Sequence, residues 1–352
     1  MTKETIFLRY REIQRFLGND GCYLYGAGTN GVWVLDWCKV AGIAVNGFID
    51  SNSSLVGTCV AGQMVLSYEE AVKKNKANTV IFVTSKHHSR EICESKYDDC
   101  LIISFDAFFF IRNIAEYSLL EFVDAKSEYV LKKICDYMLL GESESIYQIA
   151  ETNQYFCMAP FFNTGNETFV DFGACSGDTI ERFLEMHNGA YREIYAFEPG
   201  QQQRKAINHR MKRLANEWCL QEDSYHIIPA GVGRNIGKLY FETRGNIMSS
   251  QVVAMEKCTE SVEQVDIETI DHFFSSITVS FFKFDIEGSE YEALLGGENV
   301  IKRDRPKMAI SVYHRPDDLI RIYNLIKSWD LEYRFSLRHH SSLLMDTTLY
   351  CY

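Results

Sequence analysis

The sequence lacks an apolar run long enough to cross a lipid bilayer. Its longest apolar stretch, Leu101–Ile111, is interrupted by Asp106 and is shorter than the roughly 20 residues that a membrane-spanning helix needs. The N-terminal residues Met1–Thr5 carry mixed charge, whereas a signal peptide begins with basic residues followed by an apolar core. We therefore expect neither a membrane span nor a secretory leader.

Paired cysteines and an excess of positive charge are also missing. The 11 cysteines include no C-x-x-C pair, and an odd number cannot close into a full set of disulfides, which favours a reducing, cytoplasmic location. The 36 Lys and Arg against 48 Asp and Glu give a net charge of −12. Broad nucleic-acid binding needs clustered basic residues, so we expect no nucleic-acid partner and interpret the basic run Arg204–Arg213 as a solvated helix face.

A chain of 352 residues exceeds the size of one typical core, so two domains are expected. Strands alternate with helices early in the sequence, and strands are expected at Cys22–Tyr25, Val45–Ile49, Thr79–Thr84 and Leu101–Ser104. This alternation predicts a small Rossmann-like parallel sheet in residues 1–110. Helical apolar spacing then predicts a helical connector over 111–162, followed by a larger domain over 163–352.

A second series of strands and helices begins at Thr168. Strands are expected at Thr168–Phe172, Ile194–Phe197, His226–Pro229, a run ending at Asp285, and Lys307–Val312, with helices between them. Two terminal strands, Tyr333–Leu337 and Leu344–Tyr350, are joined by a short polar stretch and should pair at one edge. The fold class is therefore α/β, with a doubly wound sheet and a reversed final strand in the larger domain.

The first glycine-rich turn, Gly26-Ala27-Gly28-Thr29-Asn30-Gly31, matches G-x-G-x-x-G between an expected strand and helix. Asp50 ends the next strand, nineteen residues after Gly31. Glycines allow a phosphate to approach the helix N-terminus, and the carboxylate can accept ribose hydroxyls. Gly26, Gly28, Gly31 and Asp50 thus predict a nucleotide or nucleotide-sugar site. The alternative is a tight turn that packs helix on strand without a ligand.

The second glycine-rich turn differs in having an acid inside the strand that precedes it. Asp171 lies within Phe169–Phe172, and Gly173 and Gly177 follow four residues apart. Twenty-five residues after Gly173, Glu198 and Pro199 end the next strand. This arrangement resembles motif I and the following acidic position of class I methyltransferases. The resemblance implies that S-adenosylmethionine is the cofactor, with Asp171 orienting its ammonium and Glu198 its ribose.

Later segments extend the resemblance. Phe281–Glu290, Arg305-Pro306-Lys307 and Ala309–His314 occur in the order found in FkbM-type methyltransferases, and the similarity covers about Thr168–Tyr352. The family consists mostly of enzymes that methylate oxygen in polyketide, sugar and surface-glycan pathways. The residues that would bind the cofactor are Asp171, Gly173, Ala174, Gly177, Asp178, Thr179, Glu198, Pro199, Ala230, Gly231 and Asp285.

Three residues near the expected strand ends are candidate catalytic groups. Asp285 can receive or relay a proton from the acceptor, because the carboxyl ends of parallel strands form the ligand crevice. His314 is a candidate general base, although a buried structural histidine is the alternative. Lys283 lies two residues before Asp285, on the same face, and can pair with an acid inside the sheet. No spacing supports a metal site, so none is assigned.

Two further groups have open interpretations. The polar stretch containing Asn246, Ser249 and Ser250 is either a loop near the acceptor or a plain turn. The aromatic residues Tyr155, Phe156, Phe161 and Phe162 are either a lid over the cofactor or, as we favour, part of the core.

Together these patterns predict an S-adenosylmethionine-dependent methyltransferase that methylates a hydroxyl of a sugar, glycan or related intermediate. The expected partner is a small-molecule or glycan acceptor, with a nucleotide-sugar included, and the oligomeric state is left open, a homo-oligomer included. One alternative is a nicotinamide-dependent oxidoreductase that uses the first glycine turn. The other is a non-catalytic scaffold that senses metabolites.

Overall fold

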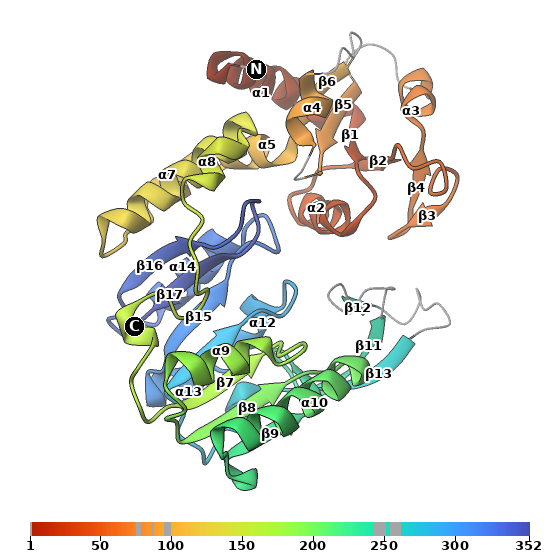
Figure 1. Ribbon diagram of the computed structural model, residues 1–352. Helices are drawn as coiled ribbons and strands as arrows, with labels where there is room; N and C mark the ends of the chain where they lie inside the picture. The colour runs from red at the N-terminus through yellow and green to blue at the C-terminus, as the bar shows by residue number, and fades with distance from the viewer. Residues whose placement is uncertain (1, 75–78, 86–87, 95–99, 243–250, 254–261) are drawn as a thin grey trace. The chain divides into compact units, whose positions relative to one another are not determined.

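The computed structural model describes residues 2–74, 79–85, 88–94, 100–242, 251–253 and 262–352 (Figure 1). Internal contacts divide the chain into two units. The first unit comprises Met1–Ala150, Tyr313–Ile320 and His339–Thr347, and the second comprises Glu151–Val312, Arg321–Arg338 and Thr348–Tyr352. The division into segments 1–110, 111–162 and 163–352 stays a prediction.

The first unit contains a six-stranded sheet in the order β3-β4-β2-β1-β5-β6. Its strands are β1 (Cys22–Tyr25), β2 (Val45–Ile49), β3 (Cys59–Val60), β4 (Gln63–Leu66), β5 (Thr79–Val83) and β6 (Cys100–Ser104). All neighbours run parallel except β3, which is antiparallel to β4. Its helices are α1 (Lys3–Asp20), α2 (Thr29–Val40), α3 (Tyr68–Lys74), α4 (Ser89–Glu94), α5 (Phe105–Arg112), α6 (Ile114–Ser118), α7 (Ala125–Leu140) and α8 (Ser143–Tyr147).

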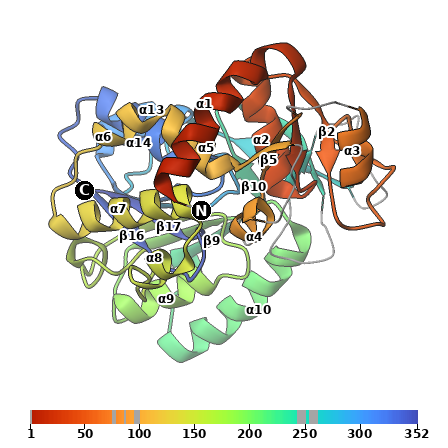
Figure 2. The same cartoon turned by 90° about the horizontal axis from the view of Figure 1, so that it is seen from above.

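Helices cover both faces of this sheet, and the side chains of β5 point alternately to one face and the other. Ile81 and Val83 pack with residues of α3 and α4, whereas Phe82 points to the other face and meets Phe108 of α5 at a ring distance of 4.5 Å. Helix α1 packs against β5, β6 and α5, and Figure 2 shows it alongside α5. The apolar character of consecutive strand residues thus follows from burial on both sides.

The second unit is built on a seven-stranded sheet in the order β16-β17-β15-β14-β7-β8-β9. The strands are β7 (Thr168–Phe172), β8 (Glu193–Phe197), β9 (Tyr225–Ile228), β14 (Phe281–Phe284), β15 (Lys307–Ser311), β16 (Phe335–His339) and β17 (Thr347–Cys351). The five strands from β9 to β15 are parallel, and β17 is antiparallel to β15. The expected doubly wound sheet with a reversed final strand is confirmed.

Aromatic residues fill both faces of this sheet. On one face, Phe169 stacks on Phe183 of α9 (Asp178–Met186), with 4.3 Å between the ring centroids. On the opposite face, Phe172 packs against Phe282, with 5.4 Å between the ring centroids. Helix α10 (Gln201–Trp218) packs against β9, as Figure 1 shows. The remaining helical segments are η1 (Ala159–Phe161), η2 (Glu222–Ser224), α11 (Ile270–Phe273), α12 (Glu290–Leu295), α13 (Glu298–Asp304) and α14 (Asp318–Ser328).

A second, four-stranded sheet in this unit has the order β10-β13-β11-β12. Its strands are β10 (Ala230–Val232), β11 (Gly237–Glu242), β12 (Gln251–Val253) and β13 (Val262–Glu268). The sequence patterns did not predict this sheet, nor the β3 and β4 pair of the first unit. The strands β3, β4, β10 and β12 have only two to four residues and give little periodic signal, and no local signal shows that the longer β11 and β13 pair with each other. In the described part of the chain, no helix has both the length and the apolar character needed to cross a membrane.

Candidate active site

The turn after β7 is pressed directly against the end of β14. Gly173 has a φ of +83°, and a Cβ at this position would lie 1.9 Å from the carbonyl oxygen of Asp285. Its amide and that of Ala174 both donate to the carbonyl of Phe197 at the end of β8, each at 3.1 Å. Gly177, with a φ of +78°, begins helix α9. The turn is therefore fixed between the ends of β8 and β14, and only glycine fits at its start.

A buried ion pair lies beneath this turn. Asp171 of β7 and Lys283 of β14 are directly opposite in the strand register, and Lys283 Nζ lies 2.8 Å from Asp171 Oδ1, with both side chains almost fully buried. The ammonium also donates to the carbonyl oxygen of Gly173 at 2.9 Å. Burial opposes its charge, but Asp171 and Asp285 outweigh that effect and hold the pKa of Lys283 above its ordinary value. Burial raises the pKa of Asp171 as well, although Lys283 acts to lower it, and the 2.8 Å contact has the geometry of an ion pair.

Glu198, which follows β8, holds the turn from the other side. Its carboxylate accepts the amide of Cys175 at 2.9 Å and that of Gly200 at 2.8 Å, and the residue is 5% exposed. Burial raises the pKa of Glu198 to about 7, although both amide bonds and Lys283 act to lower it. A buried carboxyl with this pKa, beside a glycine turn, is the kind of group found at functional sites.

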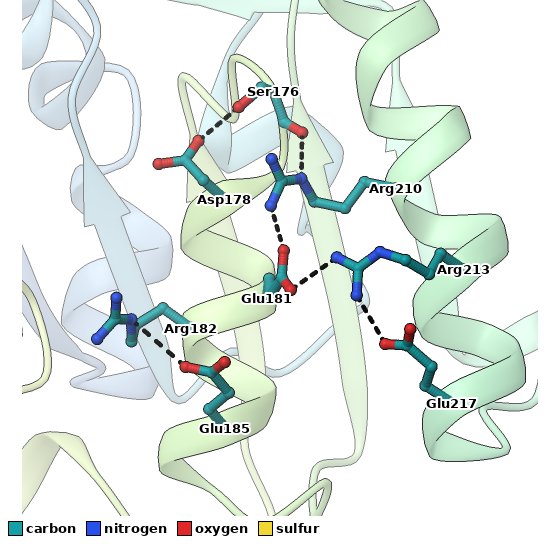
Figure 3. A network of polar contacts seen from close by, with 8 residues as sticks. All are labelled: Ser176, Asp178, Glu181, Arg182, Glu185, Arg210, Arg213 and Glu217. Carbon is teal, nitrogen blue, oxygen red and sulfur yellow. Dashed lines mark hydrogen bonds and ion pairs between the residues drawn. The ribbon is translucent and has the colours of Figure 1, made fainter.

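The same turn is attached to helices α9 and α10 through a charged network (Figure 3). Arg210 Nε donates to the carbonyl oxygen of Ser176 at 2.9 Å, and the guanidinium pairs with Glu181. Arg213 bridges Glu181 at 2.6 Å and Glu217 at 2.7 Å. The sequence predicts only a solvated face for this basic run, because the spacing of residues within a helix does not show that one arginine reaches a distant turn.

Asp285 follows β14 and is partly exposed. Its Oδ2 accepts a hydrogen bond from the Tyr155 hydroxyl at 2.9 Å, and its amide donates to the carbonyl of Phe172. Glu290 is fully buried and accepts the amide of Ile286 at 2.8 Å, so it holds the loop that follows β14. Tyr155 was expected in the core, and no local signal in the sequence reveals its contact with a residue 130 positions later.

The predicted cofactor residues of the second unit lie at the carboxyl ends of neighbouring strands. Asp178 is the first residue of α9 and accepts a hydrogen bond from Ser176. A Cβ at Gly231 of β10 would lie 3.9 Å from Pro199, which places β10 beside the end of β8. The predicted cofactor residues gathered in this way are Asp171, Gly173, Ala174, Gly177, Asp178, Thr179, Glu198, Pro199, Ala230, Gly231 and Asp285, and the candidate catalytic residue Lys283 lies among them.

The predicted residues of the first unit also come together. A Cβ at Gly31 would lie 2.0 Å from the carbonyl oxygen of Gly26, and Asp50 accepts the amide of Ala27 at 2.9 Å. A Cβ at Gly28 would meet no atom within 4 Å, and α2 begins at this glycine without a side-chain cap. The turn therefore leaves open space at a helix N-terminus.

His314 is grouped with the first unit. It is 3% exposed, and its ring lies 5.9 Å from that of Trp33 and 4.1 Å from that of Tyr313. With Trp33 it lines a small cavity that also includes Thr84 and Asp106. Its predicted role as a base stays a prediction. Asn246, Ser249 and Ser250 lie outside the described residues.

Comparison with known proteins gives three findings of different weight. Residues 171–335 match the family model of the methyltransferase FkbM domain. The chain is similar to the crystal structure of a methyltransferase FkbM from Methylobacillus flagellatus, with 19% identity, a TM-score of 0.60, and coverage of 99% of this chain and 98% of that one. No curated protein matches the sequence.

Two further similarities are partial. An rRNA methylase from Streptococcus thermophilus has 15% identity and a TM-score of 0.33, covering 55% of this chain and 89% of the other. Fibrillarin from Aeropyrum pernix, with natively bound S-adenosyl-L-methionine, has 10% identity and a TM-score of 0.31, covering 53% and 66%. The domain match supports a methyltransferase, and the first structural match supports the fold along nearly the whole chain.

The buried pair of Asp171 and Lys283 leads to a prediction about the free energy of unfolding of a single and a double variant. Lys283→Met should lower the free energy of unfolding by about 3–5 kcal/mol, because it leaves the buried carboxylate of Asp171 without its partner. Replacing both residues, as Asp171→Leu with Lys283→Met, should recover most of that loss. Urea unfolding followed by circular dichroism measures both. A double variant as unstable as the single one would contradict this account.

The raised pKa of Glu198 predicts a pH dependence of stability in the absence of ligand. The folded protein holds a proton on Glu198 that the unfolded chain releases near pH 4.5, so stability falls as pH rises towards 7. Glu198→Gln removes this loss. Its stability relative to wild type should grow by about 3 kcal/mol between pH 5 and 8, at about 1.4 kcal/mol per pKa unit. A difference that does not change with pH would show that Glu198 is not the cause.

Proposed function

We propose that the second unit binds S-adenosylmethionine at the carboxyl ends of β7, β8, β9 and β14 and transfers its methyl group to a hydroxyl. The observation that carries the proposal is the fixed turn at Gly173–Gly177 beside the buried carboxyl of Glu198. Ligands of open α/β sheets bind outside the carboxyl ends of the strands. The FkbM domain match over residues 171–335 supports the same chemistry.

The residues fit this cofactor in two respects. Gly173 has a positive φ, and β14 lies so close that no side chain fits at this position. The backbone of the turn is therefore free of a side chain where the methionine part of the cofactor would bind. Glu198 already accepts two backbone amides, so its carboxylate is oriented as a hydrogen-bond acceptor. Ribose hydroxyls would give this buried carboxylate further donors. Asp171 is paired with Lys283, so we propose that it acts on the cofactor ammonium through water.

S-adenosylmethionine supplies an electrophilic methyl group on a sulfonium. The chain's own contribution is to orient the acceptor and to accept its proton. Asp285 is partly exposed at the tip of β14, so we propose that its carboxylate takes the proton as the new oxygen–carbon bond forms. Lys283, buried on Asp171, positions the turn rather than the acceptor. The role of His314 as a base stays a prediction, because this residue is grouped with the first unit.

The proposed acceptor is a hydroxyl of a sugar, glycan or related biosynthetic intermediate. Support for this class comes from the resemblance of the sequence to FkbM-type methyltransferases and from a partly exposed carboxylate, Asp285, suited to accept the proton of an alcohol. Incubation with methyl-labelled S-adenosylmethionine and a panel of nucleotide-sugars and oligosaccharides tests it directly. Alkali-stable label on a sugar oxygen would support the proposal, and label only on amines or nucleic acids would contradict it.

We further propose that the glycine turn of the first unit binds a nucleotide or nucleotide-sugar. The favouring observation is the open space at Gly28, where the α2 N-terminus has no side-chain cap. Asp50 already accepts the amide of Ala27 in the turn, which helps to hold the turn in place, and its other oxygen accepts the amide of Asn52 in the loop after β2.

Cofactor binding by the second unit leads to a prediction that calorimetry can test. Titration calorimetry should detect saturable binding of S-adenosylmethionine and S-adenosylhomocysteine, weakened about 10- to 100-fold in Glu198→Ala because hydrogen bonds to a buried charge are lost. Asp285→Ala should change this affinity much less, and Glu185→Ala on the exposed face of α9 serves as the control. Equal losses in Glu198→Ala and Asp285→Ala would contradict the separate roles.

The first unit gives a second binding prediction. UDP should bind the wild-type chain, and Gly28→Val should abolish that binding while leaving S-adenosylmethionine affinity unchanged. Gly28 has an ordinary φ of −81°, so valine is tolerated by the backbone and only fills the space. Calorimetric titration with UDP and NAD measures the effect. Binding of NAD with hydride transfer would favour the oxidoreductase alternative, and no binding of either would leave a purely structural turn.

A further inference from the structure

The segment that precedes β7 contains an unusual backbone conformation. Asn153 and Tyr155 both have positive φ values, +62° and +68°. Asparagine adopts this conformation readily, but for a bulky residue such as tyrosine it is an outlier. Such outliers persist only where their surroundings enforce them, and they cluster at functional sites.

Two contacts enforce the conformation. The amide of Tyr155 donates to the hydroxyl of Tyr350 at 2.9 Å, and Tyr350 is fully buried in β17. Arg182 of α9 donates to the side-chain oxygen of Asn153 at 3.1 Å. The chain is thus attached on both sides of Gln154, and the position of the Tyr155 ring is determined by the second unit itself.

The hydroxyl of Tyr155 reaches the strand ends where the proposed chemistry takes place. It donates to Asp285 Oδ2 at 2.9 Å and lies 3.4 Å from Ser311 Oγ at the end of β15. Gln154 Nε2 in turn donates to the hydroxyl at 3.0 Å. The ring lies over Lys283, with the ammonium 5.3 Å from its centroid. One side chain therefore contacts both Asp285 and the buried ion pair.

Core packing alone does not account for these contacts. The neighbouring Phe156 is fully buried and packs against Phe169 and Phe183, so it supplies the apolar anchor of the segment. Tyr155 instead directs a hydroxyl at a carboxylate. A hydrogen bond donated to a carboxylate favours its ionised form and fixes its orientation.

We propose that Tyr155 is a positioning residue that orients the Asp285 carboxylate and keeps it ionised as the proton acceptor for methyl transfer. This inference rests on the proposed function. In the reaction, the acceptor O–H bond breaks and its proton moves to Asp285, while the acceptor oxygen bonds to the methyl carbon and the sulfur–carbon bond breaks. The phenolic proton of Tyr155 stays on Tyr155 throughout.

The test compares Tyr155→Phe with Tyr333→Phe. Tyr333 is a matched control because its hydroxyl donates to the carbonyl of Pro306 at 2.7 Å, before β15 begins and away from the carboxyl ends of the strands. Each variant removes one phenolic hydroxyl from the second unit: Tyr333→Phe loses the bond to Pro306, and Tyr155→Phe loses the bonds to Asp285 and Gln154. The pKa of Asp285 is measured by carbon NMR of protein labelled at the aspartate carboxyl carbon, with its signal identified by its absence in Asp285→Asn.

Tyr155→Phe should raise the pKa of Asp285 by about one unit, and Tyr333→Phe should leave it unchanged. The same pKa in Tyr155→Phe and in wild type would overturn the proposal and leave Tyr155 a structural residue. Titration of both variants with S-adenosylhomocysteine separates the two levels of the argument. A raised pKa in a protein that binds no adenosyl ligand would overturn the proposed function, and with it the methyl-transfer role, while the Tyr155–Asp285 coupling would stand.

Discussion

The buried ion pair between Asp171 and Lys283 is the interaction on which the proposed site depends. Both side chains have almost no contact with water, and the burial of either charge without its partner would be strongly unfavourable in free energy. Their pairing holds β7 and β14 in register. Lys283 also donates to the carbonyl of Gly173, so the same ammonium that neutralises Asp171 fixes the first residue of the turn above it.

Besides the bond from Lys283, the turn makes contacts with β8, α10 and β14. Phe197 and Glu198 at the end of β8 accept its amides, Arg210 of α10 donates to the carbonyl of Ser176, and β14 leaves no room for a side chain at Gly173. A turn held in this way does not need to be ordered when a ligand arrives, which lowers the entropic cost of binding. Glu198 and Asp285 are thus placed on opposite sides of a preformed turn, consistent with separate roles in binding and chemistry.

Much of the fold was predictable because its periodic signals are strong. The bounds expected for the strands at Thr168–Phe172 and Cys22–Tyr25 agree with the structure. The pairing of Lys283 with an acid also followed from the alternation of side chains along a strand. The four-stranded sheet was not predicted, because β10 and β12 have only three residues each and the pairing of the longer β11 with β13 leaves no local signal.

The sequence did not predict the contacts that Arg210 and Tyr155 make with residues distant along the chain. Arg210 belongs to a helix with an ordinary charged face, and only the packing of α10 against the turn gives it a partner in Ser176. Tyr155 lies in an aromatic segment whose composition indicates a core, whereas its hydroxyl meets Asp285 because the backbone adopts a positive φ. Neither effect is present in local sequence. The predicted roles of His314 and of the first glycine turn depend on ligands and stay predictions.

The most direct measurement is a crystal structure of the protein grown with S-adenosylhomocysteine. The account predicts the ribose hydroxyls on Glu198, the amino-acid part over Gly173–Gly177, and the Asp171–Lys283 pair unchanged beneath it. The ligand bound only at the Gly26–Gly31 turn, or bound with the Asp171–Lys283 pair broken, would contradict the central claim that this ion pair supports a preformed cofactor site.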